Sequence, residues 1–272
     1  MSRPQSPTML VTGASAGIGA ALAREYASRG WTIVATARRT ERLAALKAEL
    51  EEAHGVRVHT VSADLFEEGA VDAVLTDIAA AGLQVDGVIN NAGYGHPGLF
   101  LQSEWAEHAA FNRLMVGVPV ELTYKVLAGM KARGFGRVMQ VASLAGHMPG
   151  SRGHTLYAAV KAYLVKFSES LNAEMQGTGV HVSALCPGFT ITEFHDVNGT
   201  RAGIDALPGY MKMSAADCAR LGADALERNE DVFISGRVNR GLARLARVLP
   251  RSVAKRAMQG GSSKYRNTGE DA

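Results

Sequence analysis

The stretch Thr12-Gly13-Ala14-Ser15-Ala16-Gly17-Ile18-Gly19 follows an apolar, β-rich run at Met9–Thr12 and precedes a segment with helical periodicity at Ala20–Ser28. Glycine allows a tight turn and lets bare backbone N–H groups approach a ligand. At the start of a helix, these N–H groups and the helix dipole favour an anion such as a pyrophosphate. We therefore expect a phosphate-binding loop that uses the three glycines. The alternative is an ordinary glycine-rich turn between a strand and a helix.

Short β-rich runs and longer segments with helical periodicity alternate along the rest of the chain. This alternation favours a parallel sheet covered by helices on both faces. The strands are nearly continuous apolar runs, as expected when both faces of a sheet are buried. We predict an α/β fold with a doubly wound parallel sheet (Rossmann fold) of about seven strands. The predicted strands are Met9–Thr12, Thr32–Thr36, Arg57–Ser62, Gly87–Asn90, Arg137–Ala142, Val180–Cys186 and Asp231–Ile234, and the predicted helices include Ala20–Ser28, Glu41–Ala53, Gly69–Ala80 and Leu156–Met175.

Composition excludes several classes of protein. The chain has 272 residues, of which 47% are apolar and 20% charged, which suits one globular domain with a sizeable core. Cys186 and Cys218 are too few for a disulfide framework or a cysteine-based zinc site, so we expect a reducing, cytoplasmic compartment and no metal. No apolar run approaches the roughly 18 residues of a membrane span, and residues 1–7 lack the apolar core of a signal peptide.

The spacing of the first two glycines, with three residues between them, resembles that of the short-chain dehydrogenase/reductase family, classical type. The resemblance extends from Leu10 to about Ser235. It implies that the cofactor also contacts residues of the glycine loop and of segments that follow later strands. The residues that carry it are Thr12–Gly19, Asp64, Asn90-Asn91-Ala92-Gly93, Ser143, Tyr157–Lys161 and Pro187-Gly188, and the further cofactor contacts that it implies are Ser15, Ile18, Asp64, Asn90, Ala92, Gly93, Pro187, Gly188, Thr190 and Ile191.

The end of the second predicted strand indicates which dinucleotide binds. An acid that binds the adenosine ribose of NAD is expected about 20 residues beyond the glycines, but Ala37 stands there. Arg38 and Arg39 follow, and arginine matches a phosphate in geometry and charge. We therefore predict a site for a 2′-phosphate and NADP(H) as cofactor. Solvated arginines at a strand end are the alternative, and Asp64 could instead cap the next helix.

Tyr157 and Lys161 are four residues apart and share one face of a predicted helix. A free tyrosine has a pKa of about 10, and a nearby ammonium lowers it toward the working range of a general base. The family resemblance implies that Tyr157 exchanges the proton with the substrate oxygen, that Ser143 hydrogen-bonds that oxygen, and that Lys161 lowers the pKa of Tyr157 and holds the nicotinamide ribose.

One position departs from the family pattern. Many members carry an asparagine of a water-mediated proton relay three residues before a glycine, and counting back from Gly117 this chain has Leu114. Asn112 lies two residues away, on a different face of a regular helix. Either the relay is built otherwise, a bulge turns Asn112 inward, or activity is reduced. His147 and His154 lie near the expected mouth of the site, as substrate contacts or as solvated loop residues.

These features predict an NADP(H)-dependent oxidoreductase that acts on a ketone or secondary alcohol, more often reducing than oxidising. The alternative is an NADPH-binding sensor or interaction protein with little turnover. We expect a catalytic domain over residues 8–236, with a substrate lid at about 193–213, and a flexible N-terminus over residues 1–7. The resemblance also implies a homo-oligomer, a dimer or tetramer. Apolar lid residues suggest a hydrophobic substrate, although they could equally anchor the lid: Phe194, Ile204, Leu207, Tyr210 and Met211.

The net charge of +3 conceals an uneven distribution. Nine basic residues and no acid lie between Val232 and Thr268, so the rest of the chain carries 20 basic and 26 acidic residues. Residues 237–259 are predicted to form a basic amphipathic helical extension interrupted at Pro250, followed by a flexible tail at 260–272. The apolar face of the extension should pack on its own domain or on another subunit; contact with an anionic membrane surface is the alternative. Nucleic-acid binding is not expected, because Tyr265 is the only aromatic residue of the tail.

Overall fold

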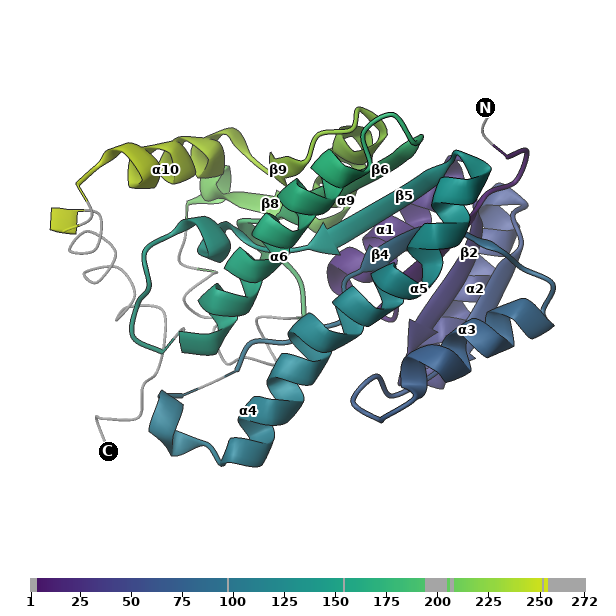
Figure 1. The fold of residues 1–272 in the computed structure, drawn as a ribbon, viewed down its shortest axis with the longest axis horizontal. Coiled ribbons are helices and arrows are strands. Elements are labelled where there is room, and N and C mark those ends of the chain that lie inside the picture. The colour runs from purple at the N-terminus through teal and green to yellow at the C-terminus, as the bar shows by residue number, and fades with distance from the viewer. Residues whose placement is uncertain are drawn as a thin grey trace.

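The computed structural model describes residues 4–96, 98–153, 155–193, 205, 208–250 and 252–253. Seven strands form one sheet in the order β3-β2-β1-β4-β5-β6-β9, and every neighbouring pair is parallel (Figure 1). The predicted doubly wound α/β fold is confirmed. The strands are β1 (Thr8–Thr12), β2 (Thr32–Ala37), β3 (Val58–Ser62), β4 (Val85–Asn90), β5 (Gly136–Val141), β6 (Val180–Cys186) and β9 (Val232–Ile234).

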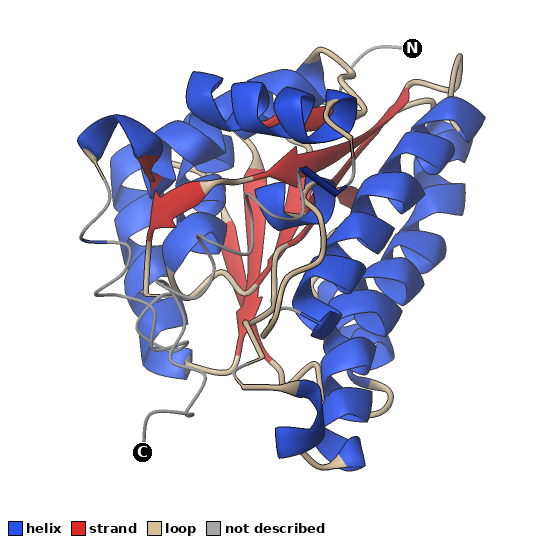
Figure 2. Ribbon diagram, turned by 90° about the vertical axis from the view of Figure 1, so that its left-hand side faces the viewer, coloured by secondary structure: helices blue, strands red, loops and turns tan. Residues whose placement is uncertain are grey.

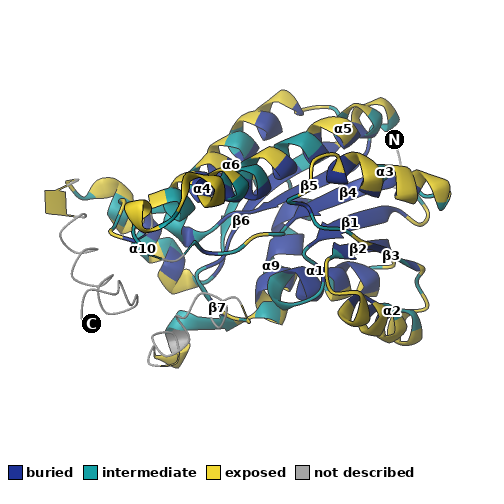
Figure 3. Ribbon diagram, turned by 90° about the horizontal axis from the view of Figure 1, so that it is seen from below, coloured by how far each residue is buried: buried dark blue, intermediate teal, exposed yellow. Residues whose placement is uncertain are grey.

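Helices cover both faces of the sheet, as Figures 2 and 3 show. One face carries α1 (Gly17–Ser28), α2 (Thr40–His54) and α9 (Ala215–Glu227). The opposite face carries α3 (Ala70–Ala80), α5 (Val118–Arg133) and α6 (Thr155–Glu174), with α4 (Trp105–Asn112) extending beyond the sheet. The buried sides of the helices face the strands, and their outer sides are exposed (Figure 3).

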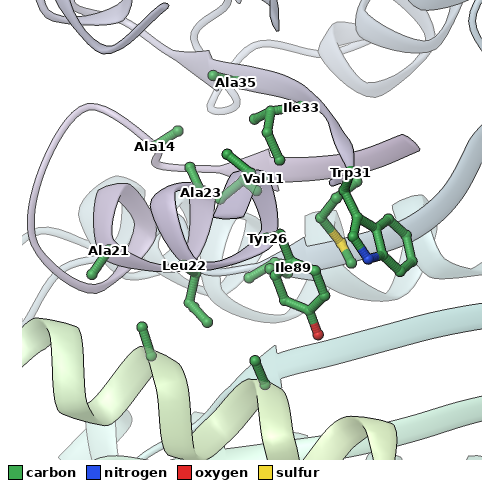
Figure 4. Packing of buried hydrophobic residues seen from close by; sticks show 14 of the residues in the cluster. Val11, Ala14, Ala21, Leu22, Ala23, Tyr26, Trp31, Ile33, Ala35 and Ile89 are labelled. Carbon is green, nitrogen blue, oxygen red and sulfur yellow. The ribbon is translucent and has the colours of Figure 1, made fainter. Parts of the chain in front are cut away.

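The core beneath α1 holds the first strand and its loop in place. Figure 4 shows Leu22 and Tyr26 of α1 directed toward neighbouring elements and Val11 of β1 packed beside them. The rings of Tyr26 and Trp31 meet edge to face with centroids 5.2 Å apart, and both are fully buried. Burying a large apolar side chain contributes about 1.5–3 kcal/mol, so this packing fixes where α1 begins relative to the sheet.

The register of the first two strands brings the glycine loop beside the arginines. Thr12 at the end of β1 pairs with Thr36 near the end of β2. The backbone N–H of Ala14 then donates to the carbonyl of Thr36 at 3.2 Å. Because parallel strands end at the same edge of the sheet, Arg38 and Arg39 emerge next to the loop that begins at Gly13.

A second, two-stranded parallel sheet flanks the segment predicted to be the substrate lid, residues 193–213. It pairs β7 (Phe189–Ile191) with β8 (Lys212–Ser214). Residues 194–204 and 206–207 of the predicted lid, which include Phe194, Ile204 and Leu207, lie outside the described residues. The pairing of Ile191 with Ser214 brings the two ends of this segment together.

The chain between α4 and α5 is not a regular α-helix. Residues Arg113–Gly117 form a π-helix, labelled η2, in which the backbone hydrogen bonds join residues i and i+5. Short 3₁₀ turns occur at η1 (Phe100–Gln102), η3 (Leu144–His147) and η4 (Gly209–Met211). Leu114, within η2, is buried in the core beside α5.

The basic extension begins with α10 (Arg237–Val248), which packs beside η3 and η4. Asn239 and Ala243 are its buried residues. Leu245, which belongs to the apolar face of the helix, is half exposed. Leu249 is extended because Pro250 follows it. The rest of the extension and tail, residues 254–272, lies outside the described part of the chain. Within the described part, no helix is long and apolar enough to cross a membrane.

Candidate active site

The backbone at Gly13 and Gly19 lies so close to neighbouring atoms that a side chain would not fit at either position. Gly13 has φ of +67°, and a Cβ there would lie 2.8 Å from Nδ2 of Asn91. A Cβ on Gly19 would lie 2.4 Å from the carbonyl oxygen of Gly13. Helix α1 begins at Gly17, and none of the described side chains caps its first turn. A helix that starts without a side-chain cap, beside a loop of bare backbone, fits the pyrophosphate of a dinucleotide.

Asn91 and Thr12 hold this loop in place, a role that the sequence patterns did not reveal. Nδ2 of Asn91 donates to the carbonyls of Thr12 at 3.0 Å and Gly13 at 3.2 Å. The hydroxyl oxygen of Thr12 accepts the backbone N–H groups of Asn91 and Ala92, both at 3.0 Å. The segment after β4 thus fixes the loop after β1.

The other members of the segment after β4 have different surroundings. Asn90 is buried, and its Nδ2 donates to the carbonyl of Pro119 and the hydroxyl of Thr123, so its amide supports α5 from below. Gly93 faces Met115, whose Sδ would lie 2.6 Å from a Cβ at that position. Asn90 therefore ties the end of β4 to α5, while Ala92 and Gly93 continue along the loop.

The two predicted phosphate-binding arginines diverge. Arg38 lies 3.9 Å from the carboxylate of Asp64 and over the ring of Phe66. Arg39 turns the other way, toward Ser15, whose Oγ accepts from Nε at 3.2 Å and from Nη2 at 3.0 Å. Asp64 also accepts the backbone N–H of Phe66 at 3.1 Å in a local turn. Arg38 and Asp64 thus share one end of the site, and Arg39 and Ser15 share another.

Ser143 follows β5 and begins the turn η3. Its Oγ accepts the N–H of Ala145 at 3.1 Å. The next residue, Leu144, donates its N–H to the carbonyl of Pro187 at 2.8 Å. The end of β5 and the segment that follows β6 are therefore tied together at the carboxyl edge of the sheet.

Lys161 of α6 reaches back under this edge. It is 6% exposed, and its Nζ donates to the carbonyl of Val141, the last residue of β5, at 2.7 Å. The same Nζ lies 5.7 Å from the centre of the Tyr157 ring. Burial lowers the pKa of Lys161 to about 8. The ammonium is thus held by a carbonyl beside the ring of Tyr157.

The turn η3 packs directly on α6. A Cβ on Gly146 would lie 2.8 Å from the backbone carbon of Lys161, so only glycine allows this approach. Ser143, Tyr157 and Lys161 are therefore brought to one edge of the sheet by β5, η3 and α6. His147 lies in the same turn, half buried, with Nε2 3.3 Å from Sγ of Cys186, and burial lowers its pKa. His154 lies outside the described residues.

The predicted cofactor contacts between Pro187 and Ile191 differ in their exposure to solvent. Thr190 is buried, whereas Ile191 is 48% exposed. Gly188 packs against Asn239 of α10, and a Cβ there would lie 2.1 Å from its Nδ2. Pro187 is tied to η3 through its carbonyl. Ile191 is the member of this segment whose side chain remains open to a ligand.

The departure at the relay position coincides with the π-helix η2. The bulge that could turn Asn112 inward is present, but Nδ2 of Asn112 donates to the carbonyl of His108 on its own helix at 3.0 Å. Leu114 points into the core. Met115, from the same bulge, packs with Phe111 and Val160 behind Tyr157. An apolar side chain therefore lies behind this part of the site.

A small pocket adjoins Tyr157. The described residues that line it include two histidines and several apolar side chains but no lysine or arginine. His108 is buried, and its Nε2 lies 2.8 Å from the carbonyl of Phe100. Among the described residues, no group of histidine, cysteine, aspartate and glutamate side chains could hold a metal ion. The lining residues are His96, Gly98, Leu99, Phe100, His108, Gly153, Thr155, Leu156 and Tyr157.

The fold and this geometry define a dinucleotide-binding α/β protein. A family model described as short chain dehydrogenase matches residues 7–201. A sulfoacetaldehyde reductase of Chromohalobacter salexigens is 36% identical over 209 residues, or 74% of this chain and 81% of that protein. The NADP-dependent 3-hydroxy acid dehydrogenase YdfG of Salmonella typhi is 35% identical over 196 residues, or 70% and 75%.

Solved structures show the same relationship. The bulky-bulky ketone specific alcohol dehydrogenase from Comamonas testosteroni is 28% identical with a TM-score of 0.76, and the match covers 99% of this chain and 98% of that one. A short-chain dehydrogenase from Sphingobium yanoikuyae in complex with NADPH is 29% identical with a TM-score of 0.76, covering 98% of each chain. This chain belongs to the short-chain dehydrogenase family, as the residues of its sequence predict. It is an oxidoreductase of that family.

Proposed function

We propose that this protein is an NADP(H)-dependent oxidoreductase that reduces an apolar ketone, or oxidises the corresponding secondary alcohol, with Tyr157 as general acid and base. Its cofactor is NADP(H), in agreement with Arg38 and Arg39, with the absence of an acid at Ala37, and with the NADP-dependent relatives. The bound cofactor supplies or accepts the hydride, and the protein provides geometry and electrostatics.

The observation that carries the proposal is the buried ammonium of Lys161 beside the Tyr157 ring. A positive charge in a water-poor site stabilises the phenolate and brings the pKa of Tyr157 toward neutrality. Tyr157 then gives its proton to the substrate oxygen during reduction and takes it back during oxidation. The hydroxyl of Ser143 donates a hydrogen bond to the same oxygen and stabilises the charge that develops on it.

The pocket beside Tyr157 supports an apolar substrate. Its described lining offers Leu99, Phe100 and Leu156, and no lysine or arginine that would bind a carboxylate or sulfonate. The Comamonas enzyme is named for bulky ketones, whereas the Chromohalobacter and Salmonella relatives are named for a sulfonated aldehyde and hydroxy acids. The described lining of this small pocket therefore favours an uncharged substrate over a sulfonated or acidic one.

The test is NADPH oxidation followed at steady state with apolar ketones and with small keto acids as a matched panel. We expect turnover with the ketones, and a fall of at least about a hundredfold in kcat for Tyr157→Phe, since general acid catalysis contributes 10²–10⁴-fold. Tyr157→Phe should still bind NADPH. Tight NADPH binding by the wild type without turnover of any compound would contradict the proposal and favour a sensor.

A further inference from the structure

A carboxylate already occupies the place where the structure gathers its phosphate-binding groups. Glu193, two residues beyond the exposed end of β7, lies against two arginines of the second strand–helix unit. Nη1 of Arg42 is 2.7 Å from both carboxylate oxygens of Glu193, and Nη1 of Arg39 is 3.3 Å from Oε2. Arg39 also bonds Ser15 of the glycine loop. Two guanidinium groups are thus already arranged around one anionic group, and one of them also bonds the glycine loop.

The backbone explains why Glu193 reaches this position. Strand β7 is held by β8, and the side chain of Thr192 then passes over Gly17, where a Cβ would lie 3.3 Å from that of Thr192. The next residue, Glu193, therefore emerges above the start of α1 and faces α2. The Arg42 guanidinium, with a smaller contribution from Arg39, holds the pKa of Glu193 below its usual range. The carboxylate is charged at neutral pH.

We propose that Glu193 is a built-in competitor for the 2′-phosphate of NADP(H), and that Arg42 joins Arg39 in binding that phosphate once it displaces the carboxylate. Arg38 is not part of this group, because it lies with Asp64 and Phe66. The phosphate carries more negative charge than a carboxylate and offers three acceptor oxygens. NADH has no such group and leaves the contact of Glu193 with the arginines intact.

The cost of displacement is small, because the contact is accessible to solvent. The side chains of Arg39, Arg42 and Glu193 are each close to half exposed, at 46%, 46% and 47%. Exposed ion pairs of this kind contribute little and are screened by salt. Glu193 therefore adjusts the strength and salt dependence of cofactor discrimination without preventing binding. The inference concerns cofactor selection and does not depend on the proposed substrate or on Tyr157.

The experiment measures the binding of NADPH, NADH and the fragment adenosine 2′,5′-bisphosphate to the full-length protein without substrate. In Glu193→Gln we expect NADPH and the bisphosphate to bind about two- to fivefold more tightly at low salt, because an exposed ion pair need no longer be broken. NADH affinity should stay within experimental error. The gain should shrink at high salt, which screens the competing carboxylate.

Glu49→Gln is the matched control. Glu49 forms an equally exposed bidentate pair with Arg24, with distances of 2.6 and 2.7 Å, so the variant removes the same charge away from Arg39 and Arg42. It should leave all three affinities unchanged. Arg42→Ala should weaken NADPH and bisphosphate binding by about tenfold or more, as expected for loss of a charge-assisted hydrogen bond, and should leave NADH unaffected.

The double variant distinguishes competition from a general charge effect. If Glu193 acts through Arg42, Glu193→Gln should improve NADPH affinity less in the Arg42→Ala background than in the wild type. Unchanged or weaker NADPH binding in Glu193→Gln would overturn the inference, as would an equal gain for NADH. Loss of turnover in Tyr157→Phe, or a failure of the ketone panel, has no bearing on these binding results.

Discussion

At the scale of single residues, Lys161 is the most demanding side chain of the proposed site. A buried ammonium costs free energy that its bond to the Val141 carbonyl only partly offsets. The lowered pKa of Lys161 is the signature of that cost. Proteins keep such groups where function requires them, at the expense of stability. The side chain that supports the proton chemistry of Tyr157 is therefore expected to destabilise the fold.

Lys161→Met provides a test through the pH dependence of stability. The folded-state pKa of about 8 lies below the ordinary lysine pKa of 10.5, so the unfolded wild type binds more protons between these pH values. The free energy of unfolding of the wild type should therefore rise with pH across this window, relative to the variant, by about 2–3 kcal/mol. Urea unfolding at pH 7 and pH 10.5 measures the change. Parallel pH curves for the two proteins would show that Lys161 titrates normally.

At the scale of elements, α10 supports the segment that follows β6 and contains Gly188, a predicted cofactor contact. Nδ2 of Asn239 donates to the carbonyl of Ser235 at 2.7 Å, and the same side chain lies against Gly188. Arg240 turns back to the carbonyl of Ile234 and over the ring of Phe233 instead of remaining in solvent. The first turns of the basic extension therefore stabilise the segment that follows β6.

Asn239→Ala should affect stability and cofactor binding together. It removes a buried hydrogen bond and leaves a space beside Gly188, so we expect a loss of about 1–3 kcal/mol in the free energy of unfolding. NADPH affinity should fall as well, because Gly188 loses its support. Chemical denaturation and fluorescence titration measure the two effects. Arg237→Ala, an exposed position on the same helix, is the control, and wild-type values in both measurements for Asn239→Ala would contradict this role of α10.

At the scale of the whole molecule, the proposed cofactor would bridge both halves of the sheet. The glycine loop follows β1, the arginines follow β2, and Ser143 and Pro187 follow β5 and β6. All these segments lie at the carboxyl edge of the parallel strands, where the strand order reverses between β1 and β4. Ligands of open α/β sheets bind at this kind of crevice. Cofactor binding should therefore stabilise the molecule as one unit.

NADPH should raise the thermal unfolding midpoint more than NADH does. A ligand present at a hundred times its Kd adds about 2.7 kcal/mol to stability, which corresponds to a shift of about 5 °C or more for a chain of this size. The arginine group should make the shift with NADH smaller at the same concentration. Differential scanning fluorimetry checks this expectation. Equal shifts with the two dinucleotides would refute selection at the 2′-phosphate.

The strands of the main sheet, the glycine loop and the family could be predicted from local patterns, because burial on both faces of the sheet and the need for bare backbone determine which residues stand next to one another in the sequence. The seven predicted strands correspond to the seven strands of the main sheet. The pairing of the strands that flank the predicted lid segment was not foreseen, since β7 and β8 are three residues long and carry no distinct periodicity.

Other features depended on contacts between residues far apart in the chain. Arg42 and Glu193 are separated by 151 residues, and only the positions of β7 and α2 bring their charges together. The divergence of Arg38 and Arg39, and the inward position of Asn239, likewise follow from which neighbours the fold supplies. Local sequence specifies which elements form, because hydrophobic period and glycine act within a few residues. Partner choice among charged side chains depends on three-dimensional proximity, for which no local pattern exists.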